Sequence, residues 1–310
     1  MNQFAAITHT PFQQPIAATV IIPCRNAAGT IESAVSTALN QTTRPMEVIV
    51  IDDASDDGSA DIAAAAGARV LRLTSRLNAG GARNHGIESA RGNVVAFLDA
   101  DVRIAADWLT RVADIFGTES SVAAVGGRIV NGRPGLFGDL DHFLNHSEWL
   151  SDRGRICSAY PTMAIAYRRD AVGPIRFPPT NHGEDIFFAL AVQKNGWTIR
   201  YEPSIRITHC HERLDFERFW VRQVEAGKAL FVTRKSLDRP GRILVRAPVL
   251  LFLYPHLWIV VARMLRQRMI IKAIVLFPWM VIGETARIIG FFRARTQTAA
   301  AAIEDHPRTT

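Results

Sequence analysis

Two aspartates at the end of an apolar run are the residues of this sequence whose types and spacing best suit chemistry. Asp99 and Asp101 follow Val94–Leu98, five apolar residues without a polar break. Such a run predicts a strand buried on both faces, and ligands of open parallel sheets bind beyond the carboxyl ends of the strands. Carboxylate oxygens suit Mg²⁺ or Mn²⁺, which would carry the phosphate oxygens of a nucleotide. A strand-end turn or a helix N-cap would also explain the pair.

A second pair of acids and one arginine belong to the same half of the chain. Asp52 and Asp53 follow the predicted strand 46–51 and open a segment rich in turn-forming residues. A carboxylate there would face the same crevice and accept hydrogen bonds from a base or a ribose. Arg83 lies in a predicted helix, and its planar, permanently charged guanidinium suits diphosphate oxygens. Pairing with an acid of the 52–57 turn is the alternative for Arg83.

Further along the chain, two acids and a histidine are candidates for proton transfer and metal binding. Glu184 and Asp185 open a predicted amphipathic helix. A carboxylate within reach of an acceptor hydroxyl can remove its proton, although acids are also favoured in a first helical turn by the helix dipole. His209 follows a predicted short strand, and a lone histidine there fits either a metal ligand or a structural role.

These residues are separated by strands that alternate with helices. Apolar, β-branched runs predict strands at 18–23, 46–51, 68–73, 94–98, 122–130, 162–167, 197–201 and 204–208. Helical spacing is found at 29–41, 59–66, 78–91, 107–116, 184–195 and 214–234. This alternation predicts an α/β fold with a mostly parallel, Rossmann-like sheet. The polar, Gly-rich stretch 131–158 shows no period that assigns it.

Composition indicates a folded chain whose positive charge is concentrated in one segment. The 310 residues are 48% hydrophobic and carry a net charge of +7. Residues 234–310 hold 13 of the 36 basic and 4 of the 29 acidic residues, so this segment is strongly basic and the remainder slightly acidic. Nucleic-acid binding would need a basic face on the globular part, and is therefore not expected. Basic charge beside apolar runs favours an anionic membrane surface.

The cysteines and the first 18 residues indicate the cellular compartment in which the chain is expected. Three cysteines form no even framework and no C-x-x-C pair, which suits a reducing compartment. Residues 1–18 have neither a basic n-region nor a long apolar run, so no signal peptide is predicted. Cytosolic exposure follows as the expectation.

The carboxyl-terminal segment has two apolar stretches. Residues 247–262 carry no charge, and 270–292 are apolar apart from Lys272, Glu284 and Arg287. A membrane span needs about 20 residues, so the first stretch is marginal and the second is interrupted. If both spanned the bilayer, the basic loop between them would emerge on the side opposite the globular domain, against the positive-inside tendency. The sequence therefore favours helices lying in the cytoplasmic face of the membrane, with packing on the globular domain as the alternative.

Five ordered stretches resemble the family-2 glycosyltransferases, nucleotide-sugar-dependent enzymes of fold type A. They are Val20–Pro23 with Arg25 and Asn26, the 52–58 turn, Ala82–Gly86, Phe97–Asp101, and Glu184 with Asp185. The resemblance covers about residues 19–235. It implies a nucleotide-binding half at 19–130 and an acceptor half at 131–235, followed by membrane-associated helices at 236–295. Tails at 1–18 and 296–310 complete the expected organisation.

The resemblance also implies a role for each matching residue. Donor binding falls to Pro23, Arg25, Asn26, Asp52, Asp53, Arg83, Asp99 and Ala100, and the metal to Asp101, Asp99 and His209. Asp185 is the expected general base of an inverting transfer, and Glu184 lies on the acceptor side. The implied cofactor is Mg²⁺ or Mn²⁺, the donor a UDP-sugar, and the acceptor a lipid-linked or cell-surface glycan. The Gln-x-x-Arg-Trp motif of the processive members is missing, which favours one transfer per encounter.

Two other functions share parts of this pattern. A nicotinamide-dependent oxidoreductase has alternating strands and an acid after the second strand, but its first turn carries G-x-G-x-x-G. Here Gly80 and Gly81 follow a later strand, which argues against that class. A catalytically degenerate membrane scaffold is the non-enzymatic alternative, and the presence of Asp99, Asp101 and Asp185 gives it no support.

Overall fold

The structure is a computed structural model that describes residues 12, 14–180, 182–212, 214–236 and 243–304. It divides into two compact units, described separately below. The first comprises the described parts of 1–132 and 149–210, and the second those of 133–148 and 211–310. The candidate site residues of the sequence analysis all belong to the first unit.

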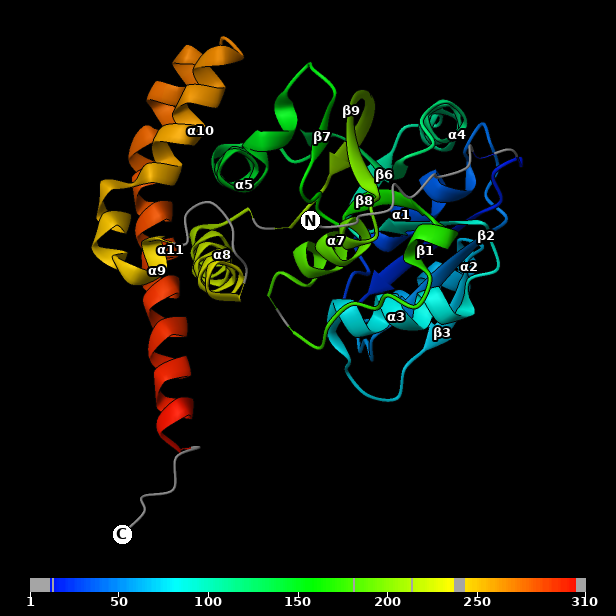
Figure 1. The fold of residues 1–310 in the computed structure, drawn as a ribbon, viewed down its shortest axis with the longest axis horizontal. Coiled ribbons are helices and arrows are strands. Elements are labelled where there is room, and N and C mark those ends of the chain that lie inside the picture. Colours follow the sequence, from blue (N-terminus) through cyan, green and yellow to red (C-terminus); the bar gives the residue numbers. More distant parts are fainter. Residues whose placement is uncertain (1–11, 13, 181, 213, 237–242, 305–310) are drawn as a thin grey trace, which may run out of the picture. The chain divides into compact units, whose positions relative to one another are not determined.

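The first unit is built on one mixed sheet of nine strands (Figure 1). The strands are β1 (Ala18–Cys24), β2 (Glu47–Asp52), β3 (Arg69–Arg72), β4 (Val94–Leu98), β5 (Val102–Ile104), β6 (Val122–Asn131), β7 (Arg155–Cys157), β8 (Ala164–Arg168) and β9 (Thr198–His209). The order is β3-β2-β1-β4-β8-β6-β9-β5, with β7 also on β9. Six strands run one way and only β5, β7 and β8 run against them. The expected α/β fold with a mostly parallel sheet is confirmed.

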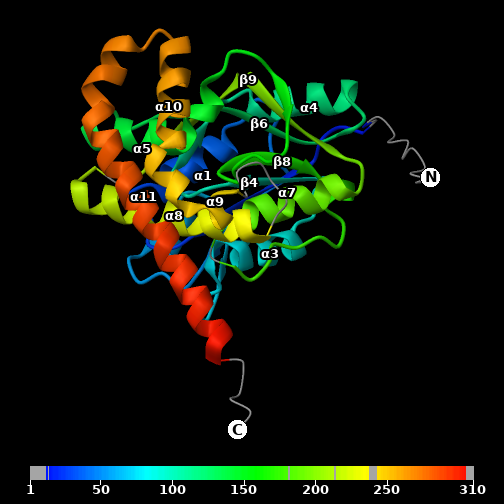
Figure 2. The same cartoon turned by 60° about the vertical axis from the view of Figure 1, so that its left-hand side comes forward.

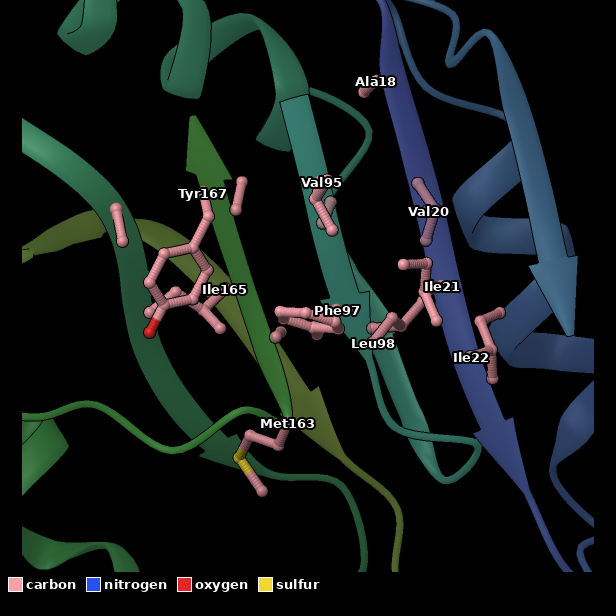
Figure 3. Packing of buried hydrophobic residues seen from close by; sticks show 14 of the residues in the cluster. Ala18, Val20, Ile21, Ile22, Val95, Phe97, Leu98, Met163, Ile165 and Tyr167 are labelled. Atoms are coloured by element: carbon pink, nitrogen blue, oxygen red, sulfur yellow. The ribbon is translucent and has the colours of Figure 1, made fainter. Parts of the chain in front are cut away.

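The centre of this sheet is β4, the strand that precedes the two aspartates. All five of its residues are buried, as predicted from the uninterrupted apolar run. Phe97 pairs in register with Ile21 of β1 and Ile165 of β8, and Figure 3 shows these neighbours around it. Its ring also meets the edge of the Tyr167 ring at a centroid distance of 6.0 Å. A strand packed on both faces holds the carboxylates at its end in fixed positions.

Six helices surround the sheet in the described part of this unit. They are α1 (Ile31–Leu39), α2 (Ser59–Ala65), α3 (Asn78–Ser89), α4 (Trp108–Thr118), α6 (Arg169–Val172) and α7 (Glu184–Lys194). Helix α3 packs on β1 and β2. A Cβ on Gly86 would lie 2.3 Å from Cγ2 of Ile21, so glycine permits this close approach. The amino-terminal end of α3 is thereby held at the edge of the sheet where β2 ends.

Two parts of the chain differ from the expectations. Two short strands were predicted at 197–201 and 204–208, but β9 is continuous through Pro203. The partner strand β6 shifts its register between Gly127 and Arg128, opposite Glu202 and Arg206, and this irregularity accommodates the proline. The unassigned stretch 131–158 contains helix α5 (Leu136–His146), the 3₁₀ helix η1 (Ser147–Leu150) and β7.

The second unit is helical. Its elements are α5, α8 (Phe216–Ser236), α9 (Ile243–Arg246), the 3₁₀ helix η2 (Pro248–Leu253), α10 (Pro255–Arg266) and α11 (Ile270–Glu304). Figure 2 shows α10 beside the first half of α11, and α8 crossing α11. The crossing is made at Gly227 and Gly290: a Cβ on either would lie 1.9 Å from a backbone oxygen of the other helix. Helix α11 extends to Glu304, beyond residue 295 where the sequence analysis ended the second apolar helix.

Two of the three charged residues that interrupt the second apolar run, Glu284 and Arg287, are buried inside this unit, whereas Lys272 is exposed. Arg287 donates to Gln223 Oε1 of α8 at 2.5 Å and to Asn145 Oδ1 of α5 at 3.0 Å. Glu284 Oε1 accepts a hydrogen bond from His256 Nδ1 of α10 at 2.7 Å. Both charges therefore serve to join helices and do not interrupt the outer apolar surface.

Two segments are long and apolar enough to cross a membrane by length and composition. They are Pro248–Arg266 and Ile270–Gln297. Of the 18 most apolar consecutive residues in each, 22% are buried in the first segment and 50% in the second. The outer residues of the first half of α11 are strongly exposed, Ile271 at 80% and Ile274 at 69%. The two compact units are defined by which residues pack together. They do not test the boundary expected at residue 235 between the glycan-transfer domain and the membrane-associated helices, which stays a prediction.

Candidate active site

The loops that follow β1 and β2 are joined by hydrogen bonds between the predicted donor-binding residues. Pro23 pairs in register with Ile51, so Arg25 and Asn26 leave the sheet beside the end of β2. The Arg25 guanidinium donates to the backbone oxygen of Asp53 at 2.7 Å. Asn26 has a left-handed φ of 48°, and its side-chain oxygen accepts from the Asp56 N–H at 3.1 Å. The structure thus brings these residues together as one edge of the site.

The two acids after β2 have different environments. Asp53 is buried, and its two carboxylate oxygens accept from the backbone N–H groups of Leu77 at 2.6 Å and Asn78 at 2.9 Å. It therefore binds the amino-terminal end of α3, satisfying N–H groups that a helix leaves unpaired. Asp52 is also buried, and its Oδ1 has no hydrogen-bond partner among the described residues. Because a buried carboxylate oxygen is costly to leave unpaired, Asp52 is the acid of this pair with capacity for a ligand.

Arg83 lies between acids from two other segments. It projects from α3, is 4% exposed, and donates to Asp99 Oδ1 at 2.8 Å and to Glu184 Oε1 at 3.2 Å. Burial acts to lower the pKa of Arg83, but the nearby Asp99 and Glu184 charges raise it above its ordinary value. The alternative partner expected from the sequence, an acid of the 52–57 turn, is not the one found. Arg83 instead joins the end of β4 to the start of α7.

Asp185 is placed beside this ion-pair cluster at the start of α7. Gly183 precedes the helix with a left-handed φ of 73°, and Asp185 Oδ1 accepts from the Ile186 N–H at 2.8 Å. Burial, with the charge of Glu184 next in size, raises the pKa of Asp185 to about 6. A carboxyl group with a pKa in this range is suited to accept a proton at neutral pH.

The last two candidates, Asp101 and His209, face each other. Antiparallel pairing sets Val102 of β5 opposite His209 at the end of β9. The backbone oxygen of Asp101 accepts from the Cys210 N–H at 2.7 Å, and Asp101 Oδ2 lies 3.4 Å from His209 Nε2. Ala100 is buried between the two aspartates. A carboxylate and an imidazole nitrogen at this separation, with the Asp99 carboxylate two residues away, are a donor set that fits Mn²⁺ or Mg²⁺.

Comparison with known proteins decides the family. Residues 19–173 match the family described as Glycosyl transferase family 2. The chain belongs to this family. Two relatives of the glycosyltransferase are AglE of Haloferax volcanii, a glycosyltransferase, and TuaG of Bacillus subtilis, assigned to teichuronic acid biosynthesis. AglE is 30% identical over 67% of this chain and 71% of its own. TuaG is 29% identical over 58% of this chain and 73% of its own.

A solved structure supports the fold of the glycosyltransferase. The mannosyltransferase PcManGT of Pyrobaculum calidifontis, in complex with GDP-Man and Mn²⁺, aligns with a TM-score of 0.61 at 16% identity. The alignment covers 92% of this chain and 89% of that one. The expected glycosyltransferase A architecture is confirmed, and the family assignment excludes the nicotinamide-dependent oxidoreductase.

The glycosyltransferase also has aromatic residues at the site that sequence reasoning did not select. The Arg83 guanidinium lies 5.5 Å from the ring centroid of Phe177, and that ring stacks on Phe188 of α7 at 4.1 Å. Tyr167 of β8 is buried, with no hydrogen-bond partner for its hydroxyl among the described residues. Its pKa is raised by burial and then by the Asp185 charge. No spacing in the sequence marks these residues, since each meets the site only through tertiary packing.

Proposed function

We propose that this chain is an inverting, metal-dependent glycosyltransferase that moves a sugar from a nucleotide-diphosphate donor, a UDP-sugar, to a hydroxyl group. The observation that carries the proposal is the cluster in which Arg83 binds Asp99 and Glu184 beside Asp185. The ion pairs of Arg83 fix the segment that carries Asp185, and the pKa of the Asp185 carboxyl is raised. Inverting transfer requires such a group on the acceptor side of the reacting carbon.

Asp185 is the proposed general base. Its carboxylate takes the proton of the acceptor hydroxyl as the hydroxyl oxygen bonds to the anomeric carbon and the bond to the diphosphate oxygen breaks. A raised pKa makes the carboxylate a stronger base than an exposed aspartate, while leaving most of it ionised at neutral pH. Arg83 limits the rise, because its positive charge lowers the pKa of Asp185. Glu184 stays on the acceptor side as a positioning residue, held by Arg83.

Asp101, Asp99 and His209 are the proposed metal ligands. The 3.4 Å between Asp101 Oδ2 and His209 Nε2 leaves both atoms directed at one region, which supports their joint use. These residues would hold a divalent cation, and the chemistry it would supply there is stabilisation of the negative charge that develops on the diphosphate. The presence of Mn²⁺ and GDP-Man in PcManGT, a structure of similar fold, supports the same cofactor and donor class here.

The proposed donor site uses the loops after β1, β2 and β4. Asp52 offers an unpaired buried carboxylate oxygen to the base or ribose, with Asp53, Pro23, Arg25 and Asn26 at the same edge. Asp53 would contribute through the α3 terminus that it holds in place. Both terminal nitrogens of Arg83 are already bonded to the carboxylates of Asp99 and Glu184. Arg83 is therefore proposed to act on the diphosphate indirectly, by holding Asp99 in place.

The proposed acceptor is a lipid-linked or cell-surface glycan, used at the cytoplasmic face of the membrane. The exposed apolar residues of α10 and α11 and the basic residues beside them support attachment to an anionic bilayer. The relationship to TuaG supports a role in polysaccharide biosynthesis.

Donor binding tests the proposal directly. The full chain is titrated with a panel of nucleotide sugars, with and without Mn²⁺, by calorimetry. A UDP-sugar should bind only with the metal, and Asp101→Ala should abolish this metal-dependent binding. Unchanged binding by Asp101→Ala would exclude the metal assignment. Binding without any transfer to glycan acceptors would favour the catalytically degenerate scaffold.

A further inference from the structure

The second unit contains a groove that the proposed reaction does not use. It lies between η2 and α11 and has a volume of about 370 Å³. Its apolar lining comes from Phe252, Ile288, Ile289 and Phe292. This volume is at the small end of the roughly 300–1,000 Å³ typical of ligand sites. The groove is therefore large enough for part of a small molecule or for one hydrocarbon chain.

The groove has a packed floor and aromatic walls. Ile288 is buried with Phe231, Leu251 and Phe291 in a hydrophobic cluster beneath it. The rings of Phe252 and Phe292 stand with their centroids 6.2 Å apart, although Phe252 is 55% exposed. An exposed aromatic ring beside a packed floor leaves apolar surface that an apolar ligand would remove from water.

The polar atoms of the lining favour an amphiphile with one negative group. The hydroxyls of Tyr254 and Thr285 lie 3.3 Å apart and can satisfy each other. Arg293 is an exposed lining residue, and no carboxylate within the described ranges forms an ion pair with it. The groove thus offers a hydrocarbon site with a single positive charge at its rim. A free phosphate would not use the apolar walls.

We propose that this groove binds an acyl chain of an anionic bilayer phospholipid, with the lipid phosphate at Arg293. The proposal rests on the membrane attachment put forward above, and it adds a specific lipid site to it. Continuity supports this occupant: Val249 and Leu253 of η2, beside the groove residue Phe252, are 67% and 66% exposed and apolar. A bilayer that covers these residues brings acyl chains to the groove.

Photolabelling tests the site with the full chain. The chain is mixed with phosphatidylcholine vesicles containing phosphatidylglycerol that carries a photoreactive acyl chain, and the labelled residues are mapped by mass spectrometry. Label should be enriched at Phe252 and at 288–292. Label spread evenly over the exposed apolar residues of α10 and α11 would overturn the proposal, while still showing membrane attachment. No nucleotide sugar is present, so the result is independent of the proposed transfer.

Two arginines provide a matched pair of variants. Arg293→Gln removes the groove charge, and Arg295→Gln removes an exposed charge two residues away that does not line the groove. Arg293→Gln should weaken phosphatidylglycerol labelling about fivefold, the effect of roughly one favourable charge near an anionic surface. Arg295→Gln should leave the yield of groove label within twofold of that of the unaltered chain. Equal losses in both variants would show a general charge effect and overturn the site.

Filling the groove gives a second test that does not depend on charge. Ile289→Trp should abolish the groove label while leaving sedimentation with the vesicles and the circular dichroism spectrum unchanged. Retained labelling in this variant would overturn the proposal. The proposal would also be overturned if an isoprenoid phosphate prevented labelling far more effectively than unlabelled phosphatidylglycerol. Crosslinks between two copies of the chain at these residues would overturn it as well.

Discussion

Asp185 is the residue on which the proposed chemistry depends most. Replacing Asp185 with Asn removes the base while keeping the side-chain size, so the transfer rate should fall by at least about 100-fold. Donor affinity should be unchanged, because Asp185 is proposed to contact the acceptor and not the donor. Steady-state transfer and calorimetric donor titration measure the two effects. Normal turnover would exclude Asp185 as the base.

The pKa of Asp185 predicts how the rate depends on pH. The base acts when ionised, and its pKa is raised to about 6. The transfer rate should therefore rise with pH through about 6 and level off above it. In Arg83→Gln the charge that lowers this pKa is lost, so the midpoint of the profile should move to higher pH. A midpoint that stays in place in Arg83→Gln would show that another group controls the profile.

The same carboxyl group predicts a cost in stability. Its pKa is raised in the folded chain to about 6, above the roughly 3.9 of an unfolded aspartate, so the folded state binds the proton more tightly. Stability should therefore fall as the pH rises from about 4 to 6 and stay level above 6. Asp185→Asn lacks this loss and should melt at a higher temperature than the unaltered chain at pH 7, with a smaller difference at pH 4. Thermal unfolding at the two pH values measures it.

At the scale of the elements, Gly290 sets the contact between α8 and α11. A Cβ at this position would lie 1.9 Å from the backbone oxygen of Val224, so Gly290→Ala should separate the helices and lower the melting temperature of the chain. Gly117 of α4 is the control, because a Cβ there meets nothing within 4 Å. Gly117→Ala should be neutral or stabilising by up to about 1 kcal/mol. Equal effects of the two substitutions would show that the crossing is not tightly packed.

Elements whose apolar pattern matches their burial are predictable from the sequence. The run 94–98 predicted a buried strand, and β4 is buried throughout. Helix α5 was missed because Asp141, His142 and His146 are among its buried residues, which reverses the usual relation between polarity and exposure. Separate strands were predicted at 197–201 and 204–208, with Pro203 between them, but a register shift in the pairing with β6 absorbs the proline.

The candidate site was predictable to the extent that it depends on strand ends. Parallel strands place the residues after β1, β2 and β4 at one edge, which the sequence pattern predicts. The ion pairs of Arg83 could not be derived, since Glu184 is 101 positions away and reaches it through the packing of α7. The participation of Phe177 has the same cause.

At the scale of the whole molecule, the division of charge and apolar surface predicts where the chain binds. The exposed apolar residues include Ile271 of α11 in the second unit and Ile156 of β7 in the first, at 80% and 53% exposed. Ile271 belongs to a run of exposed apolar residues at the start of α11, with Ile270, Ile274 and Val275, and the basic Arg266, Arg268 and Lys272 lie beside this run in the sequence. Ile156 is a single exposed apolar residue between the half-buried Arg155 and Cys157. An apolar surface flanked by positive charge should enter an anionic interface, whereas an isolated exposed isoleucine should not.

Vesicle sedimentation of matched variants tests this expectation. The full chain should sediment with vesicles rich in phosphatidylglycerol and bind less at high salt, because screening weakens attraction between the basic residues and the lipid. Ile271→Asp places a charge on the apolar surface and should reduce the bound fraction, while Ile156→Asp should leave it unchanged. Recovery of the unaltered chain in the soluble fraction, even at low salt, would contradict membrane attachment. The two helices would then be packing elements of the second unit alone.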